Sequence, residues 1–197
     1  MGVAQVSSGG DVEHKALDSS SSVTASVNFN GNLIFGHANG DLTSLEEKLV
    51  NGQGKSVNSI LHDGTHLITI DDKNITQLGT DYQQSLQVSV GNITAISNGI
   101  IVNDSPTIWC GIQDINKGLL KVISLIDGNE IASMQAAKIR MITSNTDRVV
   151  IGDEQGEVYV WEQAMLNRRF NSASVDDDDE RRQQMRERLN ALRKREL

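Results

Sequence analysis

Short runs of alternating hydrophobic and polar residues recur along most of the chain, with polar turns between them. The clearest example is RVVIGDEQGEVYVWEQ (148–163), in which two β-rich runs flank the polar turn DEQG. The same layout is present in NLIFGHANGDLTSLEE (32–47) and, less regularly, in HLITIDDKNITQLGT (66–80). Each segment predicts a β-hairpin, and a hairpin that recurs along a chain predicts a fold built from repeated units.

The predicted unit has four short strands in roughly 35–45 residues. The first strands are SVTASVNFNG (22–31), SVNSILHDG (56–64), NITAISNG (92–99) and KIRMITSNTD (138–147). Their equivalent residues Val23, Val57, Ile93 and Ile139 are 34, 36 and 46 positions apart. Second strands follow at LIFG, LITI, IIVN and VVIG. Third strands are clearest at DLTSL, NITQL and EVYVW. Fourth strands are best matched by LQVSV (86–90) and NEIASM (129–134). In the third unit, TIWCGI (107–112) and LLKVISLI (119–126) form an alternative pair of central strands. Such units predict the blades of a β-propeller.

These units resemble the blades of WD-repeat β-propellers over about residues 22–165. The resemblance rests mainly on VVIGDEQGEVYVWE, where Trp161 and Glu162 stand where that family often has Trp-Asp. The other units lack this dipeptide, and Gly36-His37 lies in the turn after a second strand, so the chain resembles a degenerate member. Quinoprotein-type propellers end their blades in similar aromatic strands and are a close alternative. The expected fold class is all-β, a β-propeller or partial propeller of about four antiparallel four-stranded blades, with a C-terminal α-helix.

Four blades raise the question of how the ring closes. An open fan of four blades leaves two blade faces and two sheet edges uncovered, which is an aggregation hazard. Closure of one chain on itself, pairing of two copies, or completion by another chain would each cover them. The blade pattern looks like that of larger rings, so we favour the last two. The expected partners are therefore other protein subunits, which could supply the remaining blades, or a second copy of this chain.

Composition divides the chain into four segments. They are a Ser/Gly-rich lead-in expected to be disordered (1–21), the WD-like blades (22–165), a polar linker (166–175) and a charged amphipathic helix (176–197).

The predicted C-terminal helix carries a short hydrophobic stripe. Met185, Leu189 and Leu192 follow one another at spacings of four and three residues, which places them on one helical face. We expect this stripe to bind a groove on a partner protein, because it is too short for a stable coiled coil alone. The alternative is a solvated, charge-rich extension. Ser174, three residues before Asp177, is a candidate phosphorylation site at the start of the helix.

The charge distribution limits the possible partners. The net charge is -8, and the seven acidic and seven basic residues of 176–197 cancel, so the whole negative charge belongs to the rest of the chain. This argues against binding to nucleic acid or to an anionic membrane surface. The sequence has no apolar run of about 18 residues and no signal-peptide pattern at its start. A single cysteine, Cys110, is typical of a reducing compartment, and we expect a cytoplasmic or nuclear protein.

Residues with catalytic chemistry do not form a recognisable constellation. His62 and His66 flank a predicted turn, and the acidic pairs Asp71-Asp72 and Asp153-Glu154 occupy equivalent turns, where turn formation is their common role. Cys110 and Trp161 are expected in the core. We therefore expect no enzyme activity, no cofactor and no metal, but a noncatalytic scaffold subunit that docks partners on propeller rims and edges and through its C-terminal helix. The alternatives are a cofactor-binding, quinoprotein-like propeller or part of a larger propeller protein.

Overall fold

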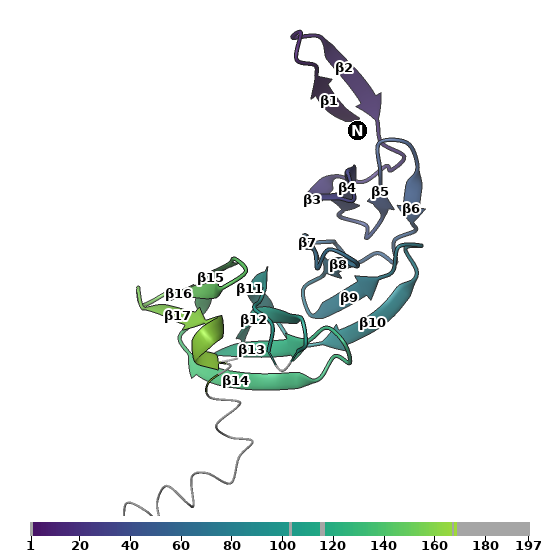
Figure 1. Cartoon of the computed structure of the whole chain (residues 1–197). Helices are drawn as coiled ribbons and strands as arrows, with labels where there is room; N and C mark the ends of the chain where they lie inside the picture. Colours follow the sequence, from purple (N-terminus) through teal and green to yellow (C-terminus); the bar gives the residue numbers. More distant parts are fainter. Residues whose placement is uncertain (1, 103, 115–116, 167, 169–197) are drawn as a thin grey trace, which may run out of the picture.

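The chain folds into four antiparallel β-sheets that follow one another as propeller blades along an open arc (Figure 1). The computed structural model describes residues 2–102, 104–114, 117–166 and 168. The prediction of an all-β fold with four propeller-like blades is confirmed. Figure 1 shows blade 1 and blade 4 at opposite ends of the arc, with the first strand of each blade on the concave side.

In each blade, strands that follow in sequence are neighbours in the sheet. Blade 1 contains β3 (Val23–Phe29), β4 (Asn32–His37), β5 (Leu42–Thr43) and β6 (Lys48–Val50). Blade 2 contains β7 (Ser59–His62), β8 (Leu67–Ile70), β9 (Asn74–Leu78) and β10 (Gln84–Ser89). Blade 3 contains β11 (Ile93–Asn98), β12 (Thr107–Gln113), β13 (Gly118–Ser124) and β14 (Glu130–Ala136). Blade 4 contains β15 (Ile139–Ser144), β16 (Arg148–Asp153) and β17 (Val158–Glu162), so within the described residues it has three strands.

The third blade uses the alternative pair of central strands. TIWCGI forms most of β12 and LLKVIS most of β13. The run IIVN is not a second strand: Ile100 and Val102 are buried in the connection between β11 and β12, where Val102 bridges to Ser105. A short apolar run fits a buried loop as well as a strand, and the longer run of β12 has more ladder partners.

Hydrophobic side chains fill the spaces between consecutive blades. Blades 1 and 2 enclose Phe29, Ile34, Leu42, Val57, Ile60, Leu67 and Leu78. Blades 2 and 3 enclose Ile68, Ile70, Ile75, Val90, Ile108, Cys110, Ile112, Ile123 and Leu125. Blades 3 and 4 enclose Ile100, Val102, Trp109, Leu120, Val122, Ile139, Ile142, Val149, Ile151 and Leu166. Because side chains alternate along a strand, an inner blade buries both faces, whereas a terminal blade has one neighbour in the arc.

The first residues differ from the expected disorder. β1 (Gly2–Val6) and β2 (Val12–Ala16) pair in an antiparallel hairpin that stands apart from the blades (Figure 1). The turn is closed by the Ser7 amide, which donates to the Asp11 carbonyl at 2.9 Å, and by Gly10 at φ 87°. Local ladder and turn bonds therefore override a composition that favours disorder.

The chain continues from β17 into a short helix at residues 163–166 and 168. Most of the predicted linker (166–175) and the whole predicted helix (176–197) lie outside the described residues. None of the helices that the structure describes is long and apolar enough to cross a membrane.

Candidate protein-interaction surface

A glycine on the second strand allows the next blade to approach closely. A Cβ atom added to Gly36 of β4 would lie 2.5 Å from Cγ1 of Val57. A Cβ atom added to Gly111 of β12 would lie 2.5 Å from Cβ of Ile139. Val57 and Ile139 are the residues that begin the following repeat unit. The glycine thus leaves room for the start of the following blade.

Gly152 of blade 4 occupies the equivalent position but has no neighbour there. It pairs with Met141, which follows the bulge of β15, as Gly36 pairs with Ala25 after the bulge of β3. A Cβ atom added to Gly152 would meet no atom within 4 Å among the described residues. Blade 4 therefore presents the same space for a following blade, and no described residue occupies it.

Exposed hydrophobic side chains gather on this blade 4 face beside Gly152, and the ion pair of Arg148 and Glu162 lies at one end of the same face. Met141, Val158 and Val160 retain 64%, 66% and 50% of their accessible surface. Tyr159 and Trp161, which alternate with the two valines on β17, pack instead against the core shared with blade 3. Hydrophobic residues gathered on one exposed sheet face mark an interaction site more often than single exposed residues do.

The hydrogen bonds at the two ends of β17 show how its backbone is oriented. Before the strand, the Asp153 amide donates to the Glu157 carbonyl at 3.1 Å. After the strand, the Gln163 amide donates to the Asp147 carbonyl at 2.9 Å. In an antiparallel ladder the residues that bond to the partner strand alternate, so odd-numbered residues of β17 bond to β16.

The even-numbered residues of β17 therefore present their backbone groups to the other edge. Val158, Val160 and Glu162 direct N–H and C=O groups away from β16, and β17 is the last strand of its sheet within the described residues. An edge of this kind is a template for one more strand.

A hydrophobic pocket of about 80 Å³ lies beside β17, between blades 3 and 4. It is lined by Val102, Trp109, Leu120, Val122, Ile131, Ala132, Ser133, Met134, Trp161 and Leu166. The ring of Trp161 packs edge-on against Trp109 with a centroid distance of 5.9 Å. Its Nε1 is buried and has no hydrogen-bond partner among the described residues. The pocket can thus accept an apolar side chain and one hydrogen-bond acceptor.

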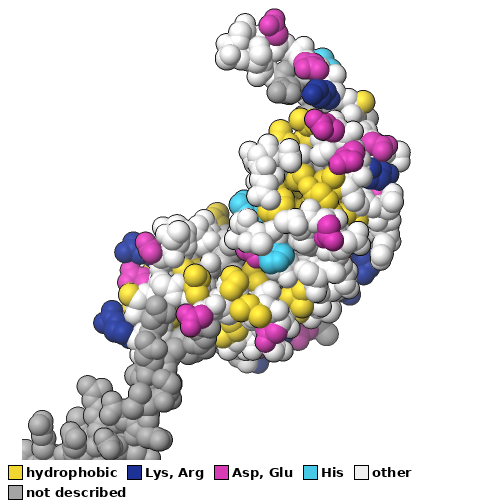
Figure 2. Space-filling model, turned by 45° about the vertical axis from the view of Figure 1, so that its right-hand side comes forward, with side chains coloured by type: hydrophobic (Ala, Val, Ile, Leu, Met, Phe, Trp, Pro, Cys, Tyr) yellow, Lys and Arg dark blue, Asp and Glu magenta, His cyan; other side chains and the backbone are white. Residues whose placement is uncertain are grey.

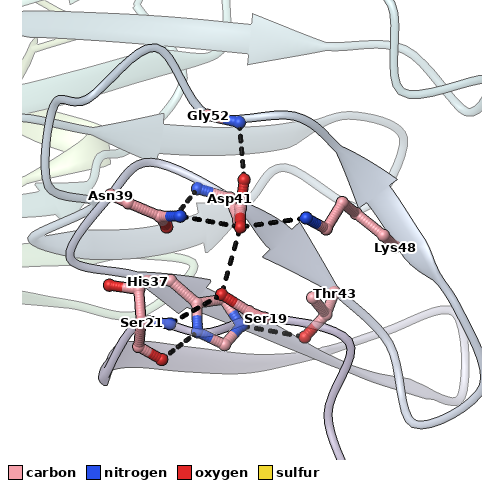
Figure 3. A network of polar contacts seen from close by, with 8 residues as sticks. All are labelled: Ser19, Ser21, His37, Asn39, Asp41, Thr43, Lys48 and Gly52. Atoms are coloured by element: carbon pink, nitrogen blue, oxygen red, sulfur yellow. Dashed lines mark hydrogen bonds and ion pairs between the residues drawn. The ribbon is translucent and has the colours of Figure 1, made fainter.

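A network of hydrogen bonds around Asp41 holds the start of the arc in place. The carboxylate of Asp41, in the turn after β4, accepts hydrogen bonds from the Gly52 amide (2.7 Å), Asn39 Nδ2 (2.8 Å), Ser19 Oγ (3.0 Å) and Lys48 Nζ (3.2 Å) (Figure 3). This carboxylate therefore ties the segment before β3 to blade 1.

A buried histidine adds to this polar network. His37 is fully buried, and its Nδ1 donates to the Ser21 carbonyl at 3.1 Å, while its Nε2 lies 2.9 Å from Thr43 Oγ1 (Figure 3). The Ala38 amide also donates to the Ser22 carbonyl at 2.9 Å. Residues 17–22, which follow β2, are thereby held on blade 1, and we read the network as structural.

The pKa of Asp41 reflects these contacts. Burial alone raises the pKa of a carboxyl group, but the bonds from the Gly52 amide, Asn39, Lys48 and Ser19 outweigh it and hold the pKa of Asp41 well below its usual range. The carboxylate is therefore ionised at any physiological pH.

Charged residues do not form a large patch of one sign on the face drawn in Figure 2. Acidic and basic side chains are mixed along the arc, and hydrophobic side chains reach the surface between them. This surface suits protein contacts better than a polyanion. Among the described residues, no group of three or more His, Cys, Asp or Glu side chains could hold a metal ion.

Several residues that the sequence singled out have structural roles. Asp71 accepts bonds from the Lys73 and Asn74 amides, and Asp153 accepts bonds from two amides of its own turn, so both acids form turns as predicted. Cys110 is buried as predicted, and burial raises the pKa of its thiol to about 12.

The candidate partner-binding residues Met185, Leu189 and Leu192 and the candidate phosphosite Ser174 lie outside the described residues. Sequence reasoning did not identify the blade 4 face. The sequence feature that indicates this face is the alternation in VYVWE, which places its two valines on one face of the strand and its two aromatic residues on the other.

Comparisons with known proteins show the fold. No protein-family profile matches the sequence, and no curated protein matches it either. Among solved structures, the chain is similar to the computationally designed protein Ika4 (TM-score 0.59, 18% identity), with 75% of this chain and 95% of Ika4 covered. It is similar to the designed protein Ika8 (TM-score 0.60, 19% identity; 78% of this chain, 50% of Ika8) and to BamB from Moraxella catarrhalis (TM-score 0.51, 12% identity; 80% of this chain, 58% of BamB). The chain thus spans about half the length of Ika8 and BamB. At these identities the similarity concerns the β-propeller fold alone.

Proposed function

We propose that this protein is a noncatalytic interaction subunit of a protein assembly and that the outer face of blade 4 is its docking surface. The observation that carries the proposal is the exposed face formed by Met141, Gly152, Val158 and Val160. Exposure of this face to water does not stabilise the folded chain. A partner that covers it removes its apolar surface from water, which contributes about 25 cal/mol of binding free energy per Å².

The fold and its resemblance to WD-repeat propellers support the same role. Propeller blades supply rigid rims and edges on which other proteins can dock, and the face drawn in Figure 2 mixes acidic and basic side chains, which suits a protein partner better than a polyanion. The predicted stripe of Met185, Leu189 and Leu192 provides a second contact, which reaches a neighbouring subunit. Cys110 suits a cytoplasmic or nuclear setting.

Affinity purification of a tagged chain from its native cells tests this role. We expect the wild-type chain to retain a fixed set of partner proteins, and the V158E/V160E variant to lose them, because two carboxylates would need to be desolvated at the contact. The matched control is I126E, since Ile126 is also exposed but lies in the turn between β13 and β14. Equal recovery of partners with wild type and V158E/V160E would overturn the proposal.

A further inference from the structure

The two ends of the arc have complementary shapes. In blades 1 and 3, the second-strand glycine receives the residue that begins the next unit, Val57 or Ile139. Ile139 is fully buried by this contact, whereas its equivalent at the start of the arc, Val23, is 37% exposed. At the other end, Gly152 has an open space of the same kind. Blade 1 therefore offers the side chain of Val23, and blade 4 offers the space beside Gly152 that would receive such a side chain.

The strands at the two ends of the arc are also complementary. β6, β10 and β14 each form the outer edge of a blade and lead directly into the first strand of the next blade. β2 leads into β3 in the same way, through residues 17–22, but the hairpin that it forms with β1 belongs to no blade. Blade 4 has no outer strand among the described residues. By chain order, β2 is the outer strand of a blade that would precede blade 1.

The two free edges also match in their backbone groups. The Ser7 amide donates to the Asp11 carbonyl, so by the same alternation Val12, His14 and Ala16 of β2 point away from β1. On β17, the backbone groups of Val158, Val160 and Glu162 point away from β16 in the same way. A two-stranded hairpin alone is marginally stable in water, so β1 and β2 gain from pairing with a further strand.

We propose that blade 4 binds the start of a second copy of this chain, with Val23 of the copy seated at Gly152 and its β2 added beside β17. This proposal rests on the proposed function and names the partner of the blade 4 face. The β2 strand would also cover the pocket that contains Trp161 and could supply an acceptor for its Nε1.

A second copy fits this position better than the chain's own β2. Figure 1 shows the hairpin beside blade 1 with blade 4 at the far end of the arc, and the Asp41 network holds residues 17–22 on blade 1. A head-to-tail contact between two such arcs can be made twice and then closes into a ring of eight blades, four from each copy.

Native mass and two blocking variants test the proposal. We expect the full chain to have twice its 21.5 kDa mass. G152L projects a large side chain into the open space, where an added Cβ atom meets nothing within 4 Å among the described residues. V160P removes an outward N–H without breaking the ladder to β16. Each should raise the dimer Kd about 100-fold. The matched controls are Q155L, which adds the same side chain to an exposed turn, and V160T, which keeps the N–H.

Cross-linking identifies the occupant of the β17 edge. A mixture of the single variants H14C and V160C, treated with a short bismaleimide, should yield a covalent dimer, and the buried Cys110 should stay unmodified. A monomeric wild type, a dimer insensitive to both G152L and V160P, or a cross-link that forms only within the H14C/V160C double variant would each overturn the proposal. Loss of native partners from V158E/V160E in a chain that is monomeric would leave the proposed function standing and refute only the second copy.

Discussion

Replacing Asp41 with alanine is expected to release residues 17–22 from blade 1. The Asp41 carboxylate accepts four hydrogen bonds, of which the one from the Gly52 amide is the shortest at 2.7 Å and the one from Lys48 is an ion pair at 3.2 Å. Removing one partner of a buried charged contact costs about 3–5 kcal/mol. The Lys48 side chain is 28% exposed and can regain water, so we take the lower end, about 3 kcal/mol.

Hydrogen exchange measures this loss locally, which suits a chain of repeated blades better than a single melting curve. About 3 kcal/mol corresponds to roughly 100-fold faster exchange of the Ala38 and Gly52 amides at neutral pH. Amides in blade 4, far along the arc, should exchange as in wild type. The matched control is D18A, because Asp18 is an exposed acid in the same segment.

The pH dependence of the same amides has a defined sign. Since the pKa of Asp41 is lowered in the folded chain, its contribution is complete above the ordinary carboxyl pKa near 4 and is lost only as the pH falls through the lowered value. Unchanged exchange of Ala38 and Gly52 in D41A would refute the reasoning that this carboxylate anchors residues 17–22.

The remaining predictions concern packing, the thiol and the C-terminal tail. G36A and G111A should each lower the free energy of unfolding by about 1–3 kcal/mol in urea titrations, since the new methyl group meets Val57 or Ile139, whereas G152A should be near neutral in the monomer. Cys110 should stay unmodified by a thiol reagent at pH 8 and react only on unfolding, because burial raises its pKa to about 12; fast labelling of the folded chain would contradict its position in the core. The triple variant M185S/L189S/L192S should abolish binding through the tail in a pull-down while the far-ultraviolet circular dichroism of the blades is kept. An unchanged pull-down would argue against the tail as a contact.

The sequence predicted the blades because the repeat is carried by regular features. Val23, Ile93 and Ile139 each begin the first strand of a blade, as their spacing indicated. The third blade was ambiguous, since IIVN and TIWCGI are both short apolar runs and only the ladder pairing of β12 decides between them.

The ends of the arc were harder to predict, because they depend on what is adjacent in space. LIFG and VVIG contain equivalent glycines. Val57 occupies the space beside Gly36, whereas the space beside Gly152 is empty among the described residues, and no local pattern encodes this difference. The lead-in has a composition that favours disorder, and its hairpin depends on pairing between β1 and β2.

The central claim is that blade 4 ends in a strand edge that another strand fills, and hydrogen exchange of the outward amides of β17 tests it most directly. The account predicts that the Val158, Val160 and Glu162 amides are protected in the full chain at high protein concentration. It also predicts that this protection is lost on dilution and in G152L. Fast exchange of these amides at every concentration, or protection that neither dilution nor G152L changes, would contradict it.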